Sequence, residues 1–321
     1  MRHFSFFFVL TVFTVTSCSN PTKHEKQKSV INIFFLENEE QTFTNVNDKA
    51  LSEIEIEDTP WISSDEIIMY DWSSHLIYLA GEKSIEQSGI PVSGKPFIVI
   101  ANGKRCYIGA LWPHYSSLWL QCPKIMVAPR YFPDDIVQIS FNEFEVYTQE
   151  NTDVRNNLYV KNALIQSAKI HYGLRCILND VKVHNSDSNA EVTYTFTIYN
   201  DDKDDLYVLD PQRMGANLFH YFTNGVYFKT ENKLYYSENP MIMEPEPYNH
   251  WEVDWHTKIK SGDSISRTLK LDGFRRIQPG EYESGFIFPS IQNVNKNDRI
   301  ILDGRIWLGR IHSSSFFINV L

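Results

Sequence analysis

The sequence predicts a mainly β chain with two domains, an α+β domain followed by an all-β sandwich. The first observation is the length of 321 residues, about twice the usual size of one domain. The second is a change of pattern near residue 147, after which strand signals dominate. The third is an ordinary globular composition, with 42% hydrophobic and 22% charged residues, which excludes a disordered chain.

The N-terminus has the layout of a secretory signal peptide over residues 1–17. Arg2 and His3 form a basic end, and an apolar run follows from Phe4 to Val15. This run is shorter than the ~20 apolar residues that a membrane-spanning helix needs. A basic end, an apolar middle and small residues at the cleavage point are typical of a segment that is removed from the mature protein.

The segment Val15-Thr16-Ser17-Cys18 resembles the lipobox of bacterial lipoprotein precursors. The resemblance implies cleavage before Cys18 and attachment of acyl chains such as palmitate to it; a plain secretory signal with an incidental cysteine is the alternative. Ser19 stands where enterobacterial lipoproteins of the inner membrane carry aspartate, so the resemblance implies the outer membrane of the cell envelope. Two or three acyl chains hold a protein on a membrane stably.

Residues 18–29 are polar and lysine-rich, a composition typical of a flexible tether. The whole chain has 30 basic and 40 acidic residues, for a net charge of −10. Without residues 1–17 it has 29 basic and 40 acidic residues, for a net charge of −11. This acidity argues against a general nucleic-acid binder. It also means that the acyl anchor, rather than surface charge, would hold the protein on an anionic membrane.

Residues 30–146 are expected to form a small α+β domain. Strands are predicted at 30–36, 52–58, 75–80 and 135–141, with a short helix at 84–87. Ser63-Ser64-Asp65-Glu66 has the composition of a helix start, so a helix is predicted from there to Met69. Asn102-Gly103 lies between two apolar runs and predicts a hairpin, because both turn positions need positive φ.

Part of this domain, about residues 58–141, carries a string of short motifs. The string consists of Tyr70-Asp71-Trp72, His75, Lys95-Pro96-Phe97, Asn102-Gly103 and Gly109-Ala110-Leu111-Trp112. It resembles a module found in uncharacterised secreted and lipid-anchored bacterial proteins. The resemblance implies a small α+β unit and brings no catalytic residue with it.

Residues 147–169 read as a linker that contains a helix. The segment Asp153–Ala168 has apolar residues near helical spacing, although part of it also fits strand alternation.

Residues 170–321 are expected to form the β-sandwich. Strands are predicted at 175–183, 191–200, 206–209, 219–222, 226–228, 264–271, 281–288, 299–308 and 316–320. Asn224-Gly225 predicts a second hairpin, and the acidic run Asp201–Asp205 a solvated turn. The run lacks the glycine and glutamate spacing of a calcium loop.

The segment Pro279-Gly280-Glu281-Tyr282 resembles the tyrosine corner of immunoglobulin-like sandwiches. The resemblance implies an immunoglobulin-like sandwich in which the tyrosine hydroxyl bonds to the backbone across the corner. A simple Pro-Gly turn is the alternative. No Cys–Trp–Cys framework is present, so antibody-type domains are excluded.

Three cysteines follow Cys18, so at least one of them stays unpaired. Cys106 and Cys122 would pair only if their strands are neighbours, and the alternative is three small buried thiols.

The stretch from His250 to His256 holds the candidate metal ligands. On a strand, alternate residues share one face, so Glu252, Asp254 and His256 would lie together. Imidazole and carboxylate suit zinc or a similar ion. The two histidines would be ~20 Å apart along a strand, so only neighbouring members of this set could share an ion. The alternative is an amphipathic strand with a solvated face, and no cofactor is expected.

Aromatic residues gather in two segments, 111–120 and 219–236. Trp112, Tyr115 and Trp119 of the first are candidates for a surface that stacks on sugars or anchors a protein; core packing is the alternative.

The sequence contains no Gly-x-Ser-x-Gly, His-Glu-x-x-His, phosphate-binding glycine loop or dinucleotide fingerprint. The leading hypothesis is therefore a lipid-anchored envelope protein that binds a protein or a glycan or has a structural role, with no assigned catalytic residue. The alternative is an envelope hydrolase, or an inhibitor of one, with an unrecognised site.

Overall fold

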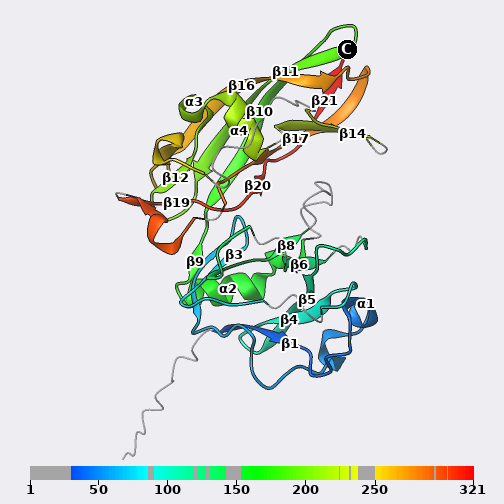
Figure 1. The fold of residues 1–321 in the computed structure, drawn as a ribbon, viewed down its shortest axis with the longest axis vertical. Coiled ribbons are helices and arrows are strands. Elements are labelled where there is room, and N and C mark those ends of the chain that lie inside the picture. Colours follow the sequence, from blue (N-terminus) through cyan, green and yellow to red (C-terminus); the bar gives the residue numbers. More distant parts are fainter. Residues whose placement is uncertain are drawn as a thin grey trace, which may run out of the picture.

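The computed structural model describes residues 30–85, 90–118, 122–127, 131–141, 153–223, 225–230, 233–237, 250–292, 294–301 and 303–321. Of these residues, 46% lie in strands and 14% in helices, which confirms the predicted mainly β class. The chain forms two parts arranged end to end, residues 30–171 and 172–321, here called the N-terminal half and the C-terminal half (Figure 1). Strand β1 (Ile31–Phe35) lies at one end of the molecule and the C-terminus at the other.

The N-terminal half contains two sheets that share a core with one helix. One sheet has the strand order β1-β4-β5-β6-β8, and the other β7-β3-β2-β9. The other strands are β2 Ile67–Asp71, β3 Leu76–Leu79, β4 Lys95–Ala101, β5 Lys104–Trp112, β6 Pro123–Met126, β7 Ile136–Gln138, β8 Ser140–Phe141 and β9 Ile170–His171. The helices are α1 Phe43–Val46, η1 Leu51–Glu53, η3 Val154–Asn156 and α2 Leu158–Gln166.

The predicted hairpin at Asn102-Gly103 is confirmed. β4 and β5 pair antiparallel on either side of it. Asn102 and Gly103 have φ of 49° and 77°, the left-handed backbone that this two-residue turn requires.

Two elements of this half differ from the sequence prediction. The helix expected up to Met69 is wrong, because Ile67–Asp71 forms β2 and pairs with β3. Glu66 accepts hydrogen bonds from Ser63, as in a helix start, but the β-branched and aromatic residues that follow favour a strand. The strand expected at 52–58 is replaced by η1 and a single bridge between Leu36 and Ile56.

The helix expected between residues 153 and 168 is present as η3 and α2. The Asn157 side chain accepts from the backbone N–H of Tyr159 at 2.9 Å and so caps the start of α2. Val160, Ala163 and Leu164 are buried in the core of the N-terminal half. This segment therefore packs on the preceding sheets before the chain enters the C-terminal half.

The C-terminal half contains three groups of strands around a second core. Their orders are β10-β11-β16, β15-β12-β19-β18 and β14-β13-β17-β20, with β21 also on β17. The strands are β10 Leu174–Asn185, β11 Asn189–Asn200, β12 Leu206–Leu209, β13 Val226–Lys229, β14 Leu234–Tyr235, β15 His256–Ile259, β16 Ser264–Arg275, β17 Gly280–Phe288, β18 Ile300–Ile301, β19 Gly304–Ile306, β20 Ile311–His312 and β21 Phe316–Val320. The helices are α3 Pro211–Met214, α4 Ala216–Phe222, η4 Val253–Trp255 and η5 Lys296–Asp298.

The hydrogen bond expected of a tyrosine corner is present. The Tyr282 hydroxyl, near the start of β17, donates to the carbonyl of Gln278 at 2.8 Å. The second hairpin prediction is wrong, because Phe219–Phe222 lies in α4 rather than in a strand. Phe219 and His220 of that helix are buried while Tyr221 is exposed, a helical rather than an alternating pattern.

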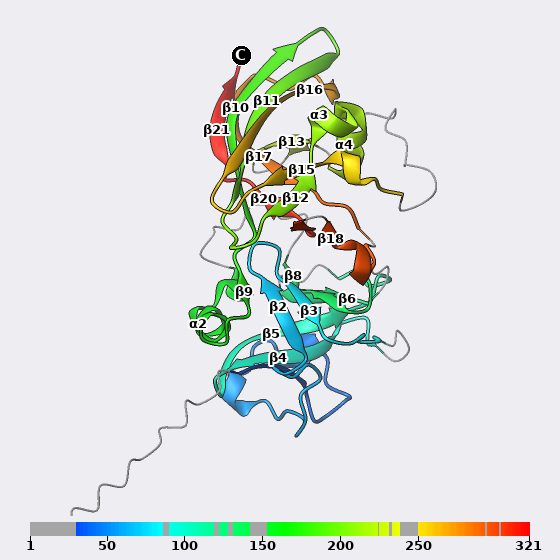
Figure 2. The same cartoon turned by 90° about the vertical axis from the view of Figure 1, so that its left-hand side faces the viewer.

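The two halves share buried apolar residues. Leu76, Tyr78 and Ile136 of the N-terminal half belong to the same core cluster as Phe288 and Trp307 of the C-terminal half. β9 pairs in parallel with β2 and leads directly into β10. Figure 2 shows the segment with β18 next to the sheet that holds β2 and β3. Burial across the junction therefore joins the two halves into one body.

We expect Gly103→Ala to destabilise the protein by about 1 kcal/mol, because a side chain disfavours the left-handed backbone even though the added Cβ meets no atom within 4 Å. Gly81→Ala is the matched control: its Cβ also meets nothing, and its φ lies outside that region. Urea denaturation of both variants checks this. Equal stability of the two variants would contradict the argument.

Candidate functional site

A buried ion pair crosses the junction between the halves. Arg299 Nη1 and Nη2 donate to the two carboxylate oxygens of Asp135 at 2.7 and 2.6 Å. Both side chains are less than 10% exposed. Burial alone would raise the pKa of Asp135, but the Arg299 hydrogen bonds and charge lower it. A bidentate pair of this kind fixes the relative orientation of the two elements that carry it.

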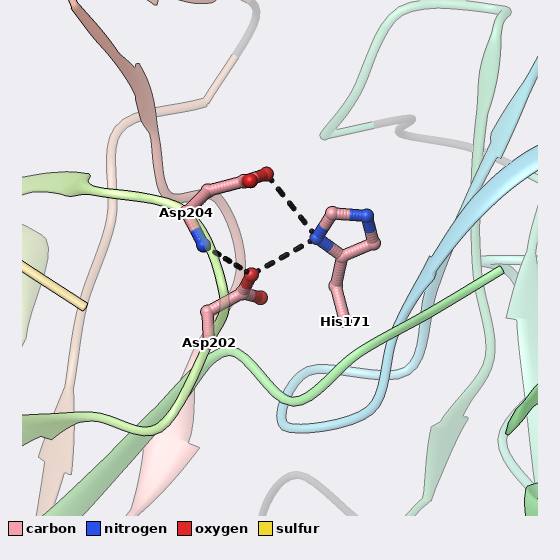
Figure 3. Close-up of side chains that lie close together, drawn as sticks. All are labelled: His171, Asp202 and Asp204. Carbon is pink, nitrogen blue, oxygen red and sulfur yellow. Dashed lines mark hydrogen bonds and ion pairs between the residues drawn. The ribbon is translucent and has the colours of Figure 1, made fainter. Parts of the chain in front are cut away.

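A second arginine, Arg305 of β19, contacts carboxylates from both halves. Its Nη2 donates to Asp202 Oδ2 at 2.9 Å and lies 3.5 Å from Asp71 Oδ2. Its Nε lies 3.6 Å from Asp204 Oδ2. His171 Nδ1 lies 3.0 Å from Asp202 Oδ1 and 3.4 Å from Asp204 Oδ2, so the imidazole joins the same cluster (Figure 3).

The expected solvated turn at Asp201–Asp205 is therefore wrong for Asp202, its second residue. Asp202 is 2% exposed, and it also accepts from the backbone N–H of Gly173 at 3.0 Å. Burial alone would raise the pKa of Asp202, but the His171 hydrogen bond and the Arg305 charge hold it far below its usual range. The turn is thus part of the junction rather than a free tip.

Three of these side chains could in principle hold a metal ion. One ligand atom each of His171, Asp202 and Asp204 lies within 4.8 Å of the others. However, the Arg305 guanidinium already contacts both carboxylates from the C-terminal half. A divalent cation there would be repelled by this permanent positive charge. We interpret the cluster as an internal ion-pair network that fastens the halves together.

The turn between β2 and β3 is fastened to the C-terminal half as well. Asp71 Oδ1 accepts from the backbone N–H and the hydroxyl of both Ser73 and Ser74, at 2.6 to 3.1 Å. The Ser73 hydroxyl in turn accepts from Trp307 Nε1 at 3.3 Å and from the Leu174 N–H at 3.2 Å. This turn therefore has little freedom to move without breaking the junction.

His75 ends this turn with an unusual backbone and a buried ring. Its φ is 51°, a left-handed value that is uncommon for a residue other than glycine. The Nδ1 atom lies 2.9 Å from the Tyr70 hydroxyl. Burial, and secondarily the Arg155 charge, keeps the pKa of His75 well below its usual range, so the imidazole is neutral at pH 7. Strained residues of this kind concentrate at functional sites.

A cavity of about 80 Å³ lies beside His75, between the two halves; we call it the junction cavity. It has space for several waters. Polar and cationic side chains from both halves line it, among them Ser73, His75, Ser140, Arg155, Arg310 and His312. None of its lining residues that the structure describes is acidic. That composition contrasts with a chain whose acidic residues outnumber its basic residues by 40 to 30.

The two arginines of the junction cavity differ in their partners. Arg155 Nε and Nη2 donate to the Asp153 carboxylate at 2.6 to 3.1 Å, and Nη1 donates to the carbonyl of Ile139 at 2.7 Å. Arg310 is exposed and has no carboxylate partner within the part of the chain that the structure describes. Arg310 and the exposed His312 lie where the cavity meets the surface.

The metal candidates from the sequence do not come together. Val253–Trp255 forms the 3-10 helix η4, so the alternating face expected for Glu252, Asp254 and His256 does not exist. His256 is buried, and its Nδ1 bonds to the carbonyl of Glu252 at 3.1 Å. Burial lowers the pKa of His256 to about 4. Glu252 and Asp254 remain exposed.

The aromatic candidates do not form an exposed strip in the described residues. Trp112 is 4% exposed and packs in a core cluster, which contradicts its proposed role in binding. Tyr115 is exposed, and its hydroxyl donates to the carbonyl of Ile90 at 2.7 Å. Trp119 lies outside the described residues, as does Cys18.

The three later cysteines are free thiols, Cys106 half-buried and Cys122 and Cys176 buried. Burial raises the pKa of Cys122 to about 11, so this thiol stays protonated. No disulfide joins Cys106 and Cys122, and two of the three thiols, Cys122 and Cys176, are buried as the alternative expects.

No known protein-family model matches the sequence, and no curated protein is significantly similar to it. The lipobox and the module at residues 58–141 therefore stay predictions. Among the residues that can be placed, no helix is both long and apolar enough to cross a membrane.

Sequence reasoning missed the residues that build the junction. Arg305 and Asp71 are 234 positions apart, and Arg305 and Asp202 are 103 positions apart. No spacing rule connects residues so distant. The only local signal was an acidic run directly after a strand, which also fits a solvated turn.

We expect Asp202→Asn to destabilise the protein by about 3 kcal/mol at pH 7, because it leaves buried groups of Arg305 and His171 without their anion. The pKa of Asp202 is lowered by folding, so its contribution is complete above its unfolded pKa near 3.8 and is lost as the pH falls toward the folded pKa. The difference from wild type should therefore shrink at pH 3. Urea denaturation at pH 7 and pH 3 measures both values.

Asp201→Asn is the control for this variant, because the Asp201 pair with Arg175 is exposed and should contribute less than about 1 kcal/mol. If both variants had the same stability at pH 7, the junction network would not have the role assigned to it.

Proposed function

We propose that the protein is a lipid-anchored binding protein of the cell envelope, held in the outer membrane through acyl chains on Cys18. Its ligand is a group on a protein or a glycan, and the junction cavity is its binding site. The observation that carries this proposal is a polar cavity walled by both halves of an acidic chain, with no acid among the lining residues that the structure describes. Binding sites occur preferentially at the interfaces between domains.

Two further observations support a binding role for this location. Two buried ion pairs, Arg299 with Asp135 and Arg305 with Asp202, join elements of the junction at which the cavity lies. The left-handed His75 is held there by the Tyr70 hydroxyl. Pre-organised walls of this kind reduce the entropy lost when a ligand binds.

For the fold, we propose an immunoglobulin-like sandwich for the C-terminal half and a small α+β unit for the N-terminal half. The hydrogen bond from Tyr282 to the Gln278 carbonyl supports the first. The packing of α2 against the two N-terminal sheets supports the second.

The second candidate function is an envelope hydrolase. A neutral, strained histidine in a polar cavity favours it, because a general base needs an unprotonated imidazole. In the described residues, however, the hydroxyl that bonds to the His75 ring is that of Tyr70, and burial raises the pKa of that phenol. A serine hydroxyl on the imidazole would be the more typical start for acyl transfer.

We expect Cys18→Ser to move the full-length protein from the membrane fraction to the soluble fraction, because the acyl attachment point is gone. Membrane fractionation after a carbonate wash measures this. Cys106→Ser is the matched control and should stay with the membrane. Retention of the Cys18→Ser variant would overturn the lipid anchor.

We expect a ligand of the junction cavity to raise the melting temperature of wild type by about 5 °C or more at saturation. The probes are neutral and acidic mono- and disaccharides and short peptides, screened by thermal shift. His312→Trp should abolish the response by covering the cavity mouth, whereas His184→Trp, an exposed residue on β10, should keep it. An equal response in both variants would place binding elsewhere, and no response in wild type would overturn the binding role.

A further inference from the structure

The described lining of the junction cavity includes one arginine without a carboxylate partner among the described residues. Asp153 neutralises the charge of Arg155 by accepting hydrogen bonds from its Nε and Nη2 atoms. Arg310 has no such partner in the described residues. No carboxylate lines the described wall, although the chain as a whole is acidic. An exposed guanidinium that lines a polar cavity and has no carboxylate partner attracts an anion.

We propose that the junction cavity binds the terminal carboxylate of a ligand, with Arg310 as the residue that recognises its charge. This inference rests on the proposed binding function and names the chemical class of the ligand. The planar guanidinium presents paired N–H donors that match the two oxygens of a carboxylate. The group enters beside Arg310 and His312, where the cavity meets the surface.

The charge balance favours a carboxylate over a phosphate. One unpaired guanidinium balances one negative charge, whereas a phosphate ester carries about −1.5 to −2 at pH 7. The negative charge of a phosphate beyond the first would have no unpaired cation to balance it among the described lining residues. The volume of about 80 Å³ has space for a carboxylate group together with several waters.

The neutral histidine of the cavity supplies a donor for the same anion. Burial raises the pKa of Tyr70, so its phenol keeps its proton at pH 7. We assign that proton to the bond with His75 Nδ1, which leaves the imidazole proton on Nε2. The cavity wall then contributes an imidazole N–H in addition to Arg310, whereas the Ser140 hydroxyl already donates to the carbonyl of Lys124. Two donors, with no acid among the described lining residues, are suited to an acceptor-only group.

Isothermal titration of the full-length protein at pH 8 tests this, because an unperturbed imidazole is neutral there. The probes are glucuronate and N-acetylalanine, which carry a sugar and a peptide carboxylate, and their neutral amides, glucuronamide and N-acetylalaninamide. Inorganic phosphate is the fifth probe. We expect at least one acid to bind about 10-fold or more tightly than its amide. The acid that binds more tightly identifies the source of the carboxylate.

Three variants complete the experiment. Arg310→Gln should weaken the acid by about 10-fold or more and leave the amide unchanged, and Arg310→Lys should keep most of the affinity because it keeps the charge. Arg276→Gln removes an exposed arginine beyond the end of β16 and should change nothing.

Equal binding of acid and amide, equal binding by wild type and Arg310→Gln, or tighter binding of phosphate than of either acid would overturn the carboxylate inference. If an amide binds and His312→Trp abolishes that binding, the proposed binding function stands and only the carboxylate inference fails. If no probe binds, the carboxylate inference fails, and the thermal-shift screen decides the proposed function separately.

Discussion

The architecture depends on one buried guanidinium. Arg305 can stay charged away from water only if carboxylates surround it, and those carboxylates come from both halves of the chain. Asp71 approaches from the N-terminal half and Asp202 from the C-terminal half. Neither half can rotate away without leaving buried charge uncompensated, which is far more costly than losing an apolar contact. Burial of the shared apolar core stabilises the contact between the two halves. The ion pairs fix the orientation of the halves relative to each other.

The same constraint shapes the junction cavity. The turn from Asp71 to His75 is tied to Trp307 and Leu174 through the Ser73 hydroxyl. With the turn held at both ends, His75 keeps a backbone that a freer loop would relax. The cavity is therefore framed by fixed walls, and its polar lining is a consequence of how the two halves are joined.

The sequence predicts most of the strands and little of the junction. The Asn102-Gly103 hairpin and the alternating strand Asn189–Asn200 follow from local rules, because turn chemistry and side-chain period act over a few residues. Phe219–Phe222 lies in α4 instead of the predicted strand, since a short apolar run fits a helix turn as well as a strand. Asp202 could not be recognised, because its burial depends on Arg305, 103 positions away. Long-range pairs of charges leave no pattern in one sequence.

The pairing of the first described residues has a mechanical consequence. The Val30 N–H donates to Asn102 Oδ1 at 2.9 Å, and the Asn102 N–H donates to the Val30 carbonyl at 2.8 Å. Beyond them, five residue pairs join β1 antiparallel to β4. A protein held by its N-terminus receives any pull at Val30, and force along β1 is shared by this whole ladder rather than opening it one bond at a time.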